Sequence, residues 1–133
     1  MSNIIKFDGP YAETMSLLEK VRHYILYEEK YDQQRIGEKS AHLINVELMD
    51  IIARLSHVLS WLIAQKAVRA GEMTIEESME PKWQLSTAIA CMGTGYEADE
   101  SIPLRLQYFT VQSRRLFERV ERLERQLLSS IHK

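Results

Sequence analysis

Hydrophobic residues recur every three or four positions through the middle of the chain, from Leu43 to Gly71. This spacing is typical of an α-helix, which completes a turn in about 3.6 residues. One apolar line is formed by Ile44, Leu48, Ile51, Leu55, Leu59 and Leu62. A second line passes through Met49, Ile52, Ile63 and Ala67, and the narrow polar stripe that is left consists of Glu47, Asp50, Arg54 and His57. Because a surface helix keeps a broad polar side, we expect this helix to be central and covered on at least two sides.

The same period predicts a long helix before the central helix and another after it. The first follows a helix-start signal at Asp8, Gly9 and Pro10. The last contains a heptad seam that the polar Ser113 interrupts, and its apolar members are Leu106, Phe109, Leu116, Val120, Leu123 and Leu127. The predicted long helices span roughly residues 10–31, 39–70 and 102–130. A short helix is expected near residues 74–79, where Thr74 and Glu77 have the spacing of a capping box.

The predicted connections between these helices differ in length. We expect the first turn over residues 33–39, which include Gly37, and we expect Gly71 to end the central helix in a left-handed conformation. Residues 82–100 have a poor periodic signal and are expected to form a long loop. The sequence therefore predicts an all-α fold: one domain over residues 1–133, built as an antiparallel three-helix bundle with long helices and a long loop before the last helix.

Composition and charge narrow the function classes. The chain has 133 residues, of which 45% are hydrophobic and 27% charged, as in an ordinary soluble domain. The net charge of −2 provides no strong field that would attract nucleic acid or an acidic membrane. Cys91 is the only cysteine, so no internal disulfide is expected. With neither a signal peptide nor a membrane-spanning run visible, we expect a cytoplasmic protein.

No residue cluster in the sequence predicts an active site. Metal motifs such as His-Glu-x-x-His and Glu-x-x-His are absent, and Cys91 has no cationic neighbour that would activate its thiol. The spacing of Gly93, Gly95 and Ala98 matches a relaxed dinucleotide pattern, but Asp99 and Glu100 follow at once and would repel phosphate. We therefore expect no enzymatic activity, no catalytic residue, no cofactor and no metal.

Two features are typical of interaction surfaces. Arg115, Arg119 and Arg122 share one stripe of the last helix, as phosphate-binding arginines would. The interleaved Glu118, Glu121 and Glu124 favour instead a solvated, ion-paired helix, which leaves nucleic-acid binding as the alternative. Trp61 and Trp83 are interpreted as core residues, with anchoring of a partner protein as the alternative.

From Arg54 to Thr74 the sequence resembles the hallmark segment of the RcdA-like family of alphaproteobacteria. The matching residues are the Ser60, Trp61 and Leu62 core and the exit sequence of Gly71, Glu72, Met73 and Thr74. The segment from Pro103 to Leu123 resembles the closing helix of the same family. The resemblance implies a three-helix bundle that forms a homodimer and acts as an adaptor in regulated proteolysis by ClpXP, in control of the cell cycle.

The same resemblance implies protein partners and no catalytic residues. The implied partners are the protease unfoldase, other adaptors and client proteins. Binding of nucleic acid or membrane is not expected. The residues predicted to contact partners are Trp61, Glu72, Met73, Arg115, Arg119 and Arg122.

Overall fold

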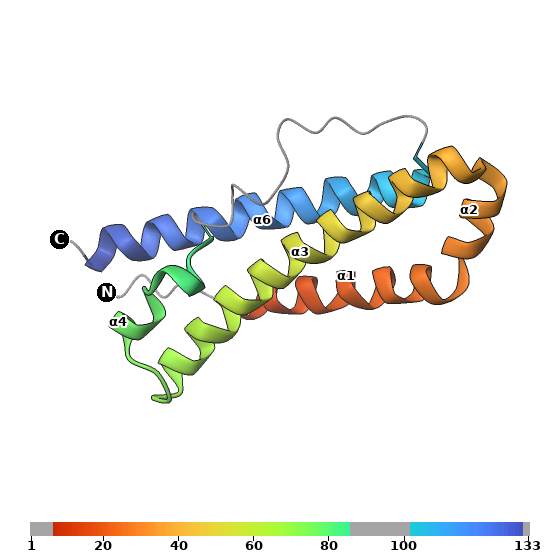
Figure 1. Ribbon diagram of the computed structural model, residues 1–133. Helices are drawn as coiled ribbons and strands as arrows, with labels where there is room; N and C mark the ends of the chain where they lie inside the picture. Colours follow the sequence, from red (N-terminus) through yellow and green to blue (C-terminus); the bar gives the residue numbers. More distant parts are fainter. Residues whose placement is uncertain (1–6, 86–101, 132–133) are drawn as a thin grey trace.

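The computed structural model of the chain describes residues 7–85 and 102–131, in which all regular structure is helical (Figure 1). The long helices are α1 (Asp8–Tyr27), α3 (Glu38–Arg69) and α6 (Leu104–Ile131). The short elements are α2 (Glu29–Ile36), α4 (Ile75–Ser78) and the 3-10 helix η1 (Pro81–Trp83). The predicted all-α fold is confirmed.

The three long helices pack side by side, and α1 runs antiparallel to both of the others (Figure 1). Lys66 near the end of α3 lies 3.7 Å from Asp8 at the start of α1. Glu13 of α1 pairs with Arg119 in the second half of α6. The expected antiparallel arrangement thus describes α1, whereas α3 and α6 run in the same direction.

The corner between α1 and α3 is more helical than the sequence suggested. The first turn was expected over residues 33–39, but α2 occupies this region up to Ile36. The chain reverses at Gly37, whose φ of 92° lies in the region that glycine adopts without a steric penalty. The Tyr24 hydroxyl donates a hydrogen bond of 2.7 Å to Asp32 Oδ2, which holds α2 against α1.

The exit from α3 follows the predicted signals. Gly71 has a φ of 77°, and the backbone N–H of Glu72 donates to the carbonyl of Ala67 at 2.9 Å. Thr74 and Glu77 form the expected capping box at the start of α4, with the Glu77 N–H donating to Thr74 Oγ1 at 3.1 Å. Most of the predicted loop over residues 82–100, including Cys91 and the Gly93 pattern, lies outside the described residues.

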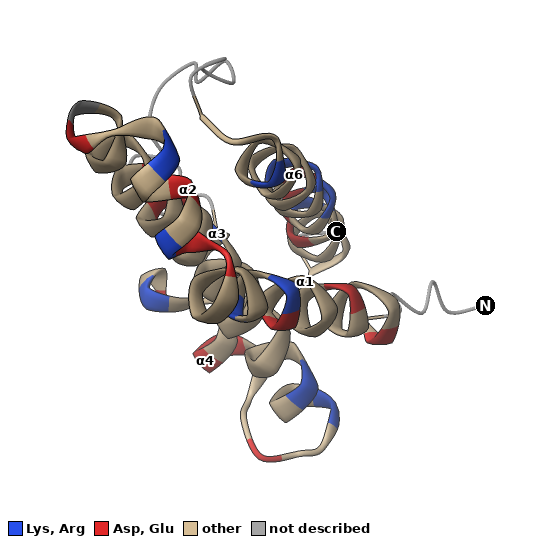
Figure 2. Cartoon of the chain, turned by 90° about the vertical axis from the view of Figure 1, so that its right-hand side faces the viewer, with Lys and Arg blue, Asp and Glu red and all other residues tan. Residues whose placement is uncertain are grey.

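The core lies where α1, α3 and α6 face one another. Its fully buried members include Tyr24, Ile44, Ile51, Leu55, Leu62, Leu106, Phe109 and Val120. Phe7, just before α1, packs edge-on against Trp61 with ring centroids 5.4 Å apart. In the end-on view of Figure 2, residues of both charge signs are spread over α1, α2 and α6, so none of these three helices carries one sign alone.

Candidate interaction surfaces

The side of α3 that faces α6 contains buried charged residues. Glu47 is 2% exposed and Arg54 is 1% exposed, although both belong to the polar stripe of the central helix. The Thr110 hydroxyl donates a hydrogen bond to Glu47 Oε2, and Arg54 Nη1 donates to Ser113 Oγ at 2.7 Å. Ser113, the polar interruption of the heptad seam, is therefore the partner of a buried arginine. These contacts fix how α3 lies along α6.

The opposite side of α3 is exposed and apolar. We define the α3 outer face as Val46, Met49, Ile52, Ala53, Ser56, Ser60 and Ile63. Met49 is 71% exposed, and the side chains of Val46, Ile52 and Ile63 are exposed as well. Helical geometry places no charged residue of the fully described stretch 45–67 on this face, whose border is formed by the half-buried Asp50 and His57.

The spacing along the α3 outer face suits contact with another helix. Val46, Met49, Ala53, Ser56, Ser60 and Ile63 are separated by alternating steps of three and four residues. This is the spacing of a coiled-coil seam, in which residues of one helix insert between those of its neighbour. The small side chains in the middle of the seam allow a second backbone to approach closely. The apolar line that the sequence placed through Met49, Ile52 and Ile63 is thus uncovered in the single chain.

Trp61 and Trp83 take different positions. Trp61 is 2% exposed and packs on Phe7, so its ring is part of the core and not an exposed anchor for a partner. Trp83 is half-buried in η1, with Lys82 Nζ 5.5 Å from the centroid of its ring. Glu72 and Met73 lie in the turn between α3 and α4, where Glu72 is exposed and Met73 is half-buried. Among the residues predicted to contact partners, Trp61 is therefore the one that is buried.

The arginine stripe of α6 is less neutralised than its sequence suggests. Glu121 and Glu124 are buried on the inner side of α6, where Glu124 Oε2 accepts the backbone N–H of Leu85 at 2.8 Å. Arg119 forms an ion pair with Glu13 of the neighbouring helix α1. Arg115 and Arg122 are exposed and form no ion pair within the described residues, whereas Arg125 pairs with Glu121 at 2.6 Å, as expected of an ion-paired helix. Arg115, Arg119 and Arg122 form a basic outer surface on α6, apart from Glu72 and Met73.

Shifted pKa values occur at the corner between α1 and α2. Burial, together with the hydrogen bond to Asp32, raises the pKa of Tyr24 above its ordinary value. Burial also raises the pKa of Glu29. Neither Tyr24 nor Glu29 is among the residues that line the described grooves. We interpret both shifts as consequences of packing at the corner.

Metal sites and membrane-spanning helices are two further kinds of functional feature. No three His, Cys, Asp or Glu side chains in residues 7–85 and 102–131 come together as a metal site requires. None of the helices in this part of the chain combines the length and the hydrophobicity that crossing a lipid bilayer requires.

Comparison with known proteins identifies a family and a similar solved structure. The sequence pattern of the family described as "Protein of unknown function (DUF1465)" matches residues 2–133. The crystal structure of RcdA from Caulobacter crescentus CB15 is similar to this chain with a TM-score of 0.71 and 30% sequence identity. The similarity covers 94% of this chain and 92% of RcdA. No curated protein matches.

Proposed function

The chain belongs to the DUF1465 family and is RcdA-like, and from this premise we propose that it is a non-enzymatic adaptor that acts by binding other proteins. Its proposed role is in regulated proteolysis by ClpXP and in control of the cell cycle, in the cytoplasm. The resemblance of residues 54–74 to the RcdA-like hallmark segment supports this role, as does the similarity of the whole fold to RcdA. The proposed partners are the ClpX unfoldase, other adaptors and client proteins.

The observation that carries the proposal is the α3 outer face. Covering an exposed apolar surface on a helix is favourable by a free energy of roughly 25 cal/mol for each Å² that is removed from water. Large exposed apolar patches are typical of protein interaction sites. The coiled-coil spacing of this face favours another helix as the covering element. We propose that α3 of a second copy covers it, which would make the adaptor a homodimer.

Measurement of mass in solution tests the proposed dimer. We expect the wild-type protein to sediment as a dimer at micromolar concentration. The double variant Met49→Asp with Ile63→Asp should sediment as a monomer, because its dimer interface would have to bury two carboxylates from each copy. The matched control is Val111→Asp, which changes an exposed valine on α6. A wild-type monomer at these concentrations, or equal dissociation of the control, contradicts the dimer.

Purified ClpX tests the adaptor role. We expect the immobilised protein to retain ClpX, and we expect added protein to change the rate at which ClpXP degrades a client. The same binding should survive in the Val111→Asp control. Failure to retain ClpX, together with an unchanged degradation rate, contradicts the role in ClpXP proteolysis while leaving the proposed dimer intact.

Nucleic-acid binding through Arg115, Arg119 and Arg122 is the second candidate function. It is supported by the inward position of Glu121 and Glu124, which leaves these arginines less compensated at the surface. Such binding should appear as a mobility shift at low salt and vanish as salt is added, because phosphate contacts release counterions. Arg122→Glu should abolish the shift. This result without ClpX retention would favour the alternative.

A further inference from the structure

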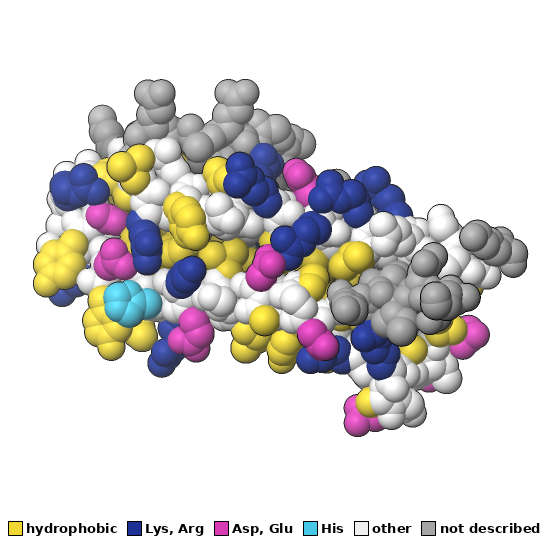
Figure 3. All heavy atoms as spheres, turned by 180° about the vertical axis from the view of Figure 1, so that it is seen from behind, with side chains coloured by type: hydrophobic (Ala, Val, Ile, Leu, Met, Phe, Trp, Pro, Cys, Tyr) yellow, Lys and Arg dark blue, Asp and Glu magenta, His cyan; other side chains and the backbone are white. Residues whose placement is uncertain are grey.

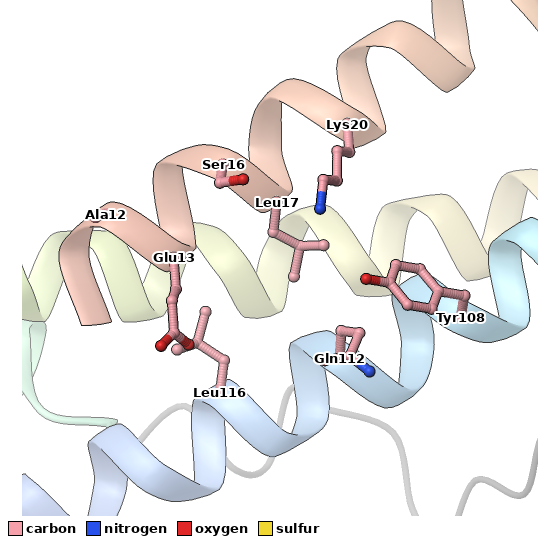
Figure 4. A pocket seen from close by; sticks show the side chains of 8 residues that line it. All are labelled: Ala12, Glu13, Ser16, Leu17, Lys20, Tyr108, Gln112 and Leu116. Atoms are coloured by element: carbon pink, nitrogen blue, oxygen red, sulfur yellow. The ribbon is translucent and has the colours of Figure 1, made fainter. Parts of the chain in front are cut away.

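A groove of about 310 Å³ lies between the antiparallel helices α1 and α6 (Figure 4). Its walls are two rows at four-residue spacing, with Ala12, Ser16 and Lys20 on α1 and Tyr108, Gln112 and Leu116 on α6. Residues four apart lie on the same side of a helix, so each row forms one wall. Because Ala12 and Ser16 are small, the α1 wall does not fill the space that the longer residues of α6 enclose.

The bottom of the groove is apolar. Leu17 and Leu116 both line it, and both are nearly buried. They offer hydrocarbon surface to whatever enters, while the polar groups stand higher on the walls. A volume near 300 Å³ is at the small end of ligand sites and suits one or two side chains better than a large cofactor.

The polar groups of the groove leave one positive charge without a partner. Figure 4 shows the Lys20 ammonium and the Tyr108 hydroxyl pointing into the space between the two helices. Lys20 is exposed and forms no hydrogen bond or ion pair among the described residues. The carboxylate of Glu13 at one end of the groove is already paired with Arg119.

From this complementarity we propose that the groove binds an acidic peptide segment of a partner protein, with an apolar side chain beside a carboxylate. The apolar side chain rests on Leu17 and Leu116. The carboxylate pairs with Lys20 and accepts a hydrogen bond from the Tyr108 hydroxyl. Figure 3 shows Lys and Arg side chains flanking exposed hydrophobic side chains on the back of the molecule. The inference rests on the proposed adaptor function, because it specifies the chemistry of a segment that the adaptor would hold.

Titration of the full chain with defined peptides tests the groove. The probe is a short fluorescein-labelled peptide of alternating leucine and glutamate, and the matched probe has glutamine in place of every glutamate. We expect saturable binding of the glutamate peptide alone, weakening with added salt because the contact is between charges near the surface. On the isotopically labelled protein, the backbone amide signals of Ser16, Lys20 and Gln112 should shift.

Substitutions then separate the groove from the general charge of the protein. Lys20→Glu should weaken binding of the glutamate peptide about tenfold, the effect of losing one favourable ion pair and adding a repulsion. Lys30→Glu makes the same charge change on α2, outside the groove, and should weaken binding less than about twofold. Tyr108→Phe removes one hydroxyl and should weaken binding by a smaller factor. Both lysines are exposed, and unchanged thermal unfolding of each variant verifies that it folds.

Several results would overturn the inference. They are equal weakening by Lys20→Glu and Lys30→Glu, equal binding of the glutamine peptide, absence of saturable binding, and tighter binding of a single-stranded DNA oligonucleotide than of the glutamate peptide. The last result would identify a nucleic acid as the occupant. Retention of ClpX without peptide binding contradicts the groove alone, whereas peptide binding without retention of ClpX contradicts the adaptor role alone.

Discussion

Two groups of residues on α3 differ in polarity from their surroundings: charged residues inside the core and apolar residues facing solvent. The side that faces α6 contains Glu47 and Arg54, both of which are almost inaccessible to solvent. The side that faces solvent presents Met49, Ile52 and Ile63. An ordinary amphipathic helix confines its apolar residues to the inner side and its charged residues to the outer side, so the two charged residues within the apolar core and the apolar outer face both depart from that pattern. The difference teaches that the inner side requires a specific fit to α6, whereas the outer side has no such requirement within the described residues.

The inner side gains specificity from groups that are costly to bury. A charged side chain loses several kcal/mol of hydration on burial and must recover it through hydrogen bonds. Glu47 and Arg54 do so with Thr110 and Ser113, which are 63 and 59 residues away along the chain. A slide of α3 along α6 would break both contacts at once. Apolar residues on the outer side impose no such condition on the fold of the single chain.

Removal of Arg54 is the strongest way to break the inner side. Arg54→Ala should lower the free energy of unfolding by about 3–5 kcal/mol, because it empties a fully buried position and deletes the hydrogen bond to Ser113. Urea denaturation followed by circular dichroism measures the change. Arg122→Ala, on the exposed side of α6, is the control and should cost less than about 0.5 kcal/mol. Equal losses would show that the inner polar contacts add nothing.

A smaller change on the same side tests the contact of Glu47. Thr110→Val keeps the shape of the side chain and removes the hydroxyl that donates to Glu47, so we expect a loss of about 1.5–3 kcal/mol in unfolding free energy. The reverse exchange at the neighbouring exposed position, Val111→Thr, should cost less than about 0.5 kcal/mol. The comparison fails if the two substitutions have the same effect in urea.

The buried Tyr24 forms a hydrogen bond to a residue close by in the sequence. It can therefore be compared with the buried contacts of α3, whose partners are distant in the sequence. Tyr24→Phe should cost about 1 kcal/mol, because it removes the hydrogen bond to Asp32, eight residues away. Burial raises the pKa of Tyr24, so its unfolded form loses its proton first. The contribution of the phenol is therefore complete below pH of about 10 and declines as pH rises beyond that value.

The alkaline decline is measured by urea denaturation of both proteins between neutral pH and pH of about 11. The wild-type protein should lose stability more steeply than Tyr24→Phe above pH of about 10. Parallel pH profiles for the two proteins would contradict the assignment of the decline to Tyr24.

The smallest effect on the fold is expected on the outer side of α3. Met49→Gln should change the unfolding free energy by less than about 0.5 kcal/mol at concentrations where the protein is monomeric, since the side chain is already largely hydrated. The adjacent Leu48→Gln introduces an amide into the core and should cost more than about 2 kcal/mol. A large loss in the Met49 variant would mean that this face is covered within the chain.

The helices could be predicted from the sequence because their signals are local. Periodicity identified the three long helices, and the capping box at Thr74 and the left-handed Gly71 were both confirmed. Each signal involves residues within a few positions of one another, so no knowledge of the remaining chain is needed. The predicted turn over residues 33–39 did contain the corner at Gly37, but the predicted first helix over residues 10–31 ends at Tyr27, and the weak apolar pattern of residues 33–36 concealed the separate helix α2.

The surfaces could not be predicted in the same way because they depend on distant partners. A polar stripe has the same sequence whether it meets water or hydroxyl groups of another helix, so Glu47 and Arg54 gave no sign of their burial. Likewise, Glu124 looked like a partner for surface arginines, yet its carboxylate accepts the backbone N–H of Leu85 in the core, whereas Glu121 does pair with the exposed Arg125. The groove beside Lys20 arises only when Ala12 and Ser16 are placed opposite α6.

The place of α6 after α1 and α3 in the chain has a consequence for synthesis on the ribosome. α6 is translated after both, so α1 and α3 leave the exit tunnel before the helix that covers them. Nascent domains in this state are prone to aggregate through their uncovered apolar surface. Until α6 arrives, Glu47 and Arg54 are available to water on the very side that awaits it. The charges that later set the fit between the helices thus interrupt the apolar surface that stays uncovered until then.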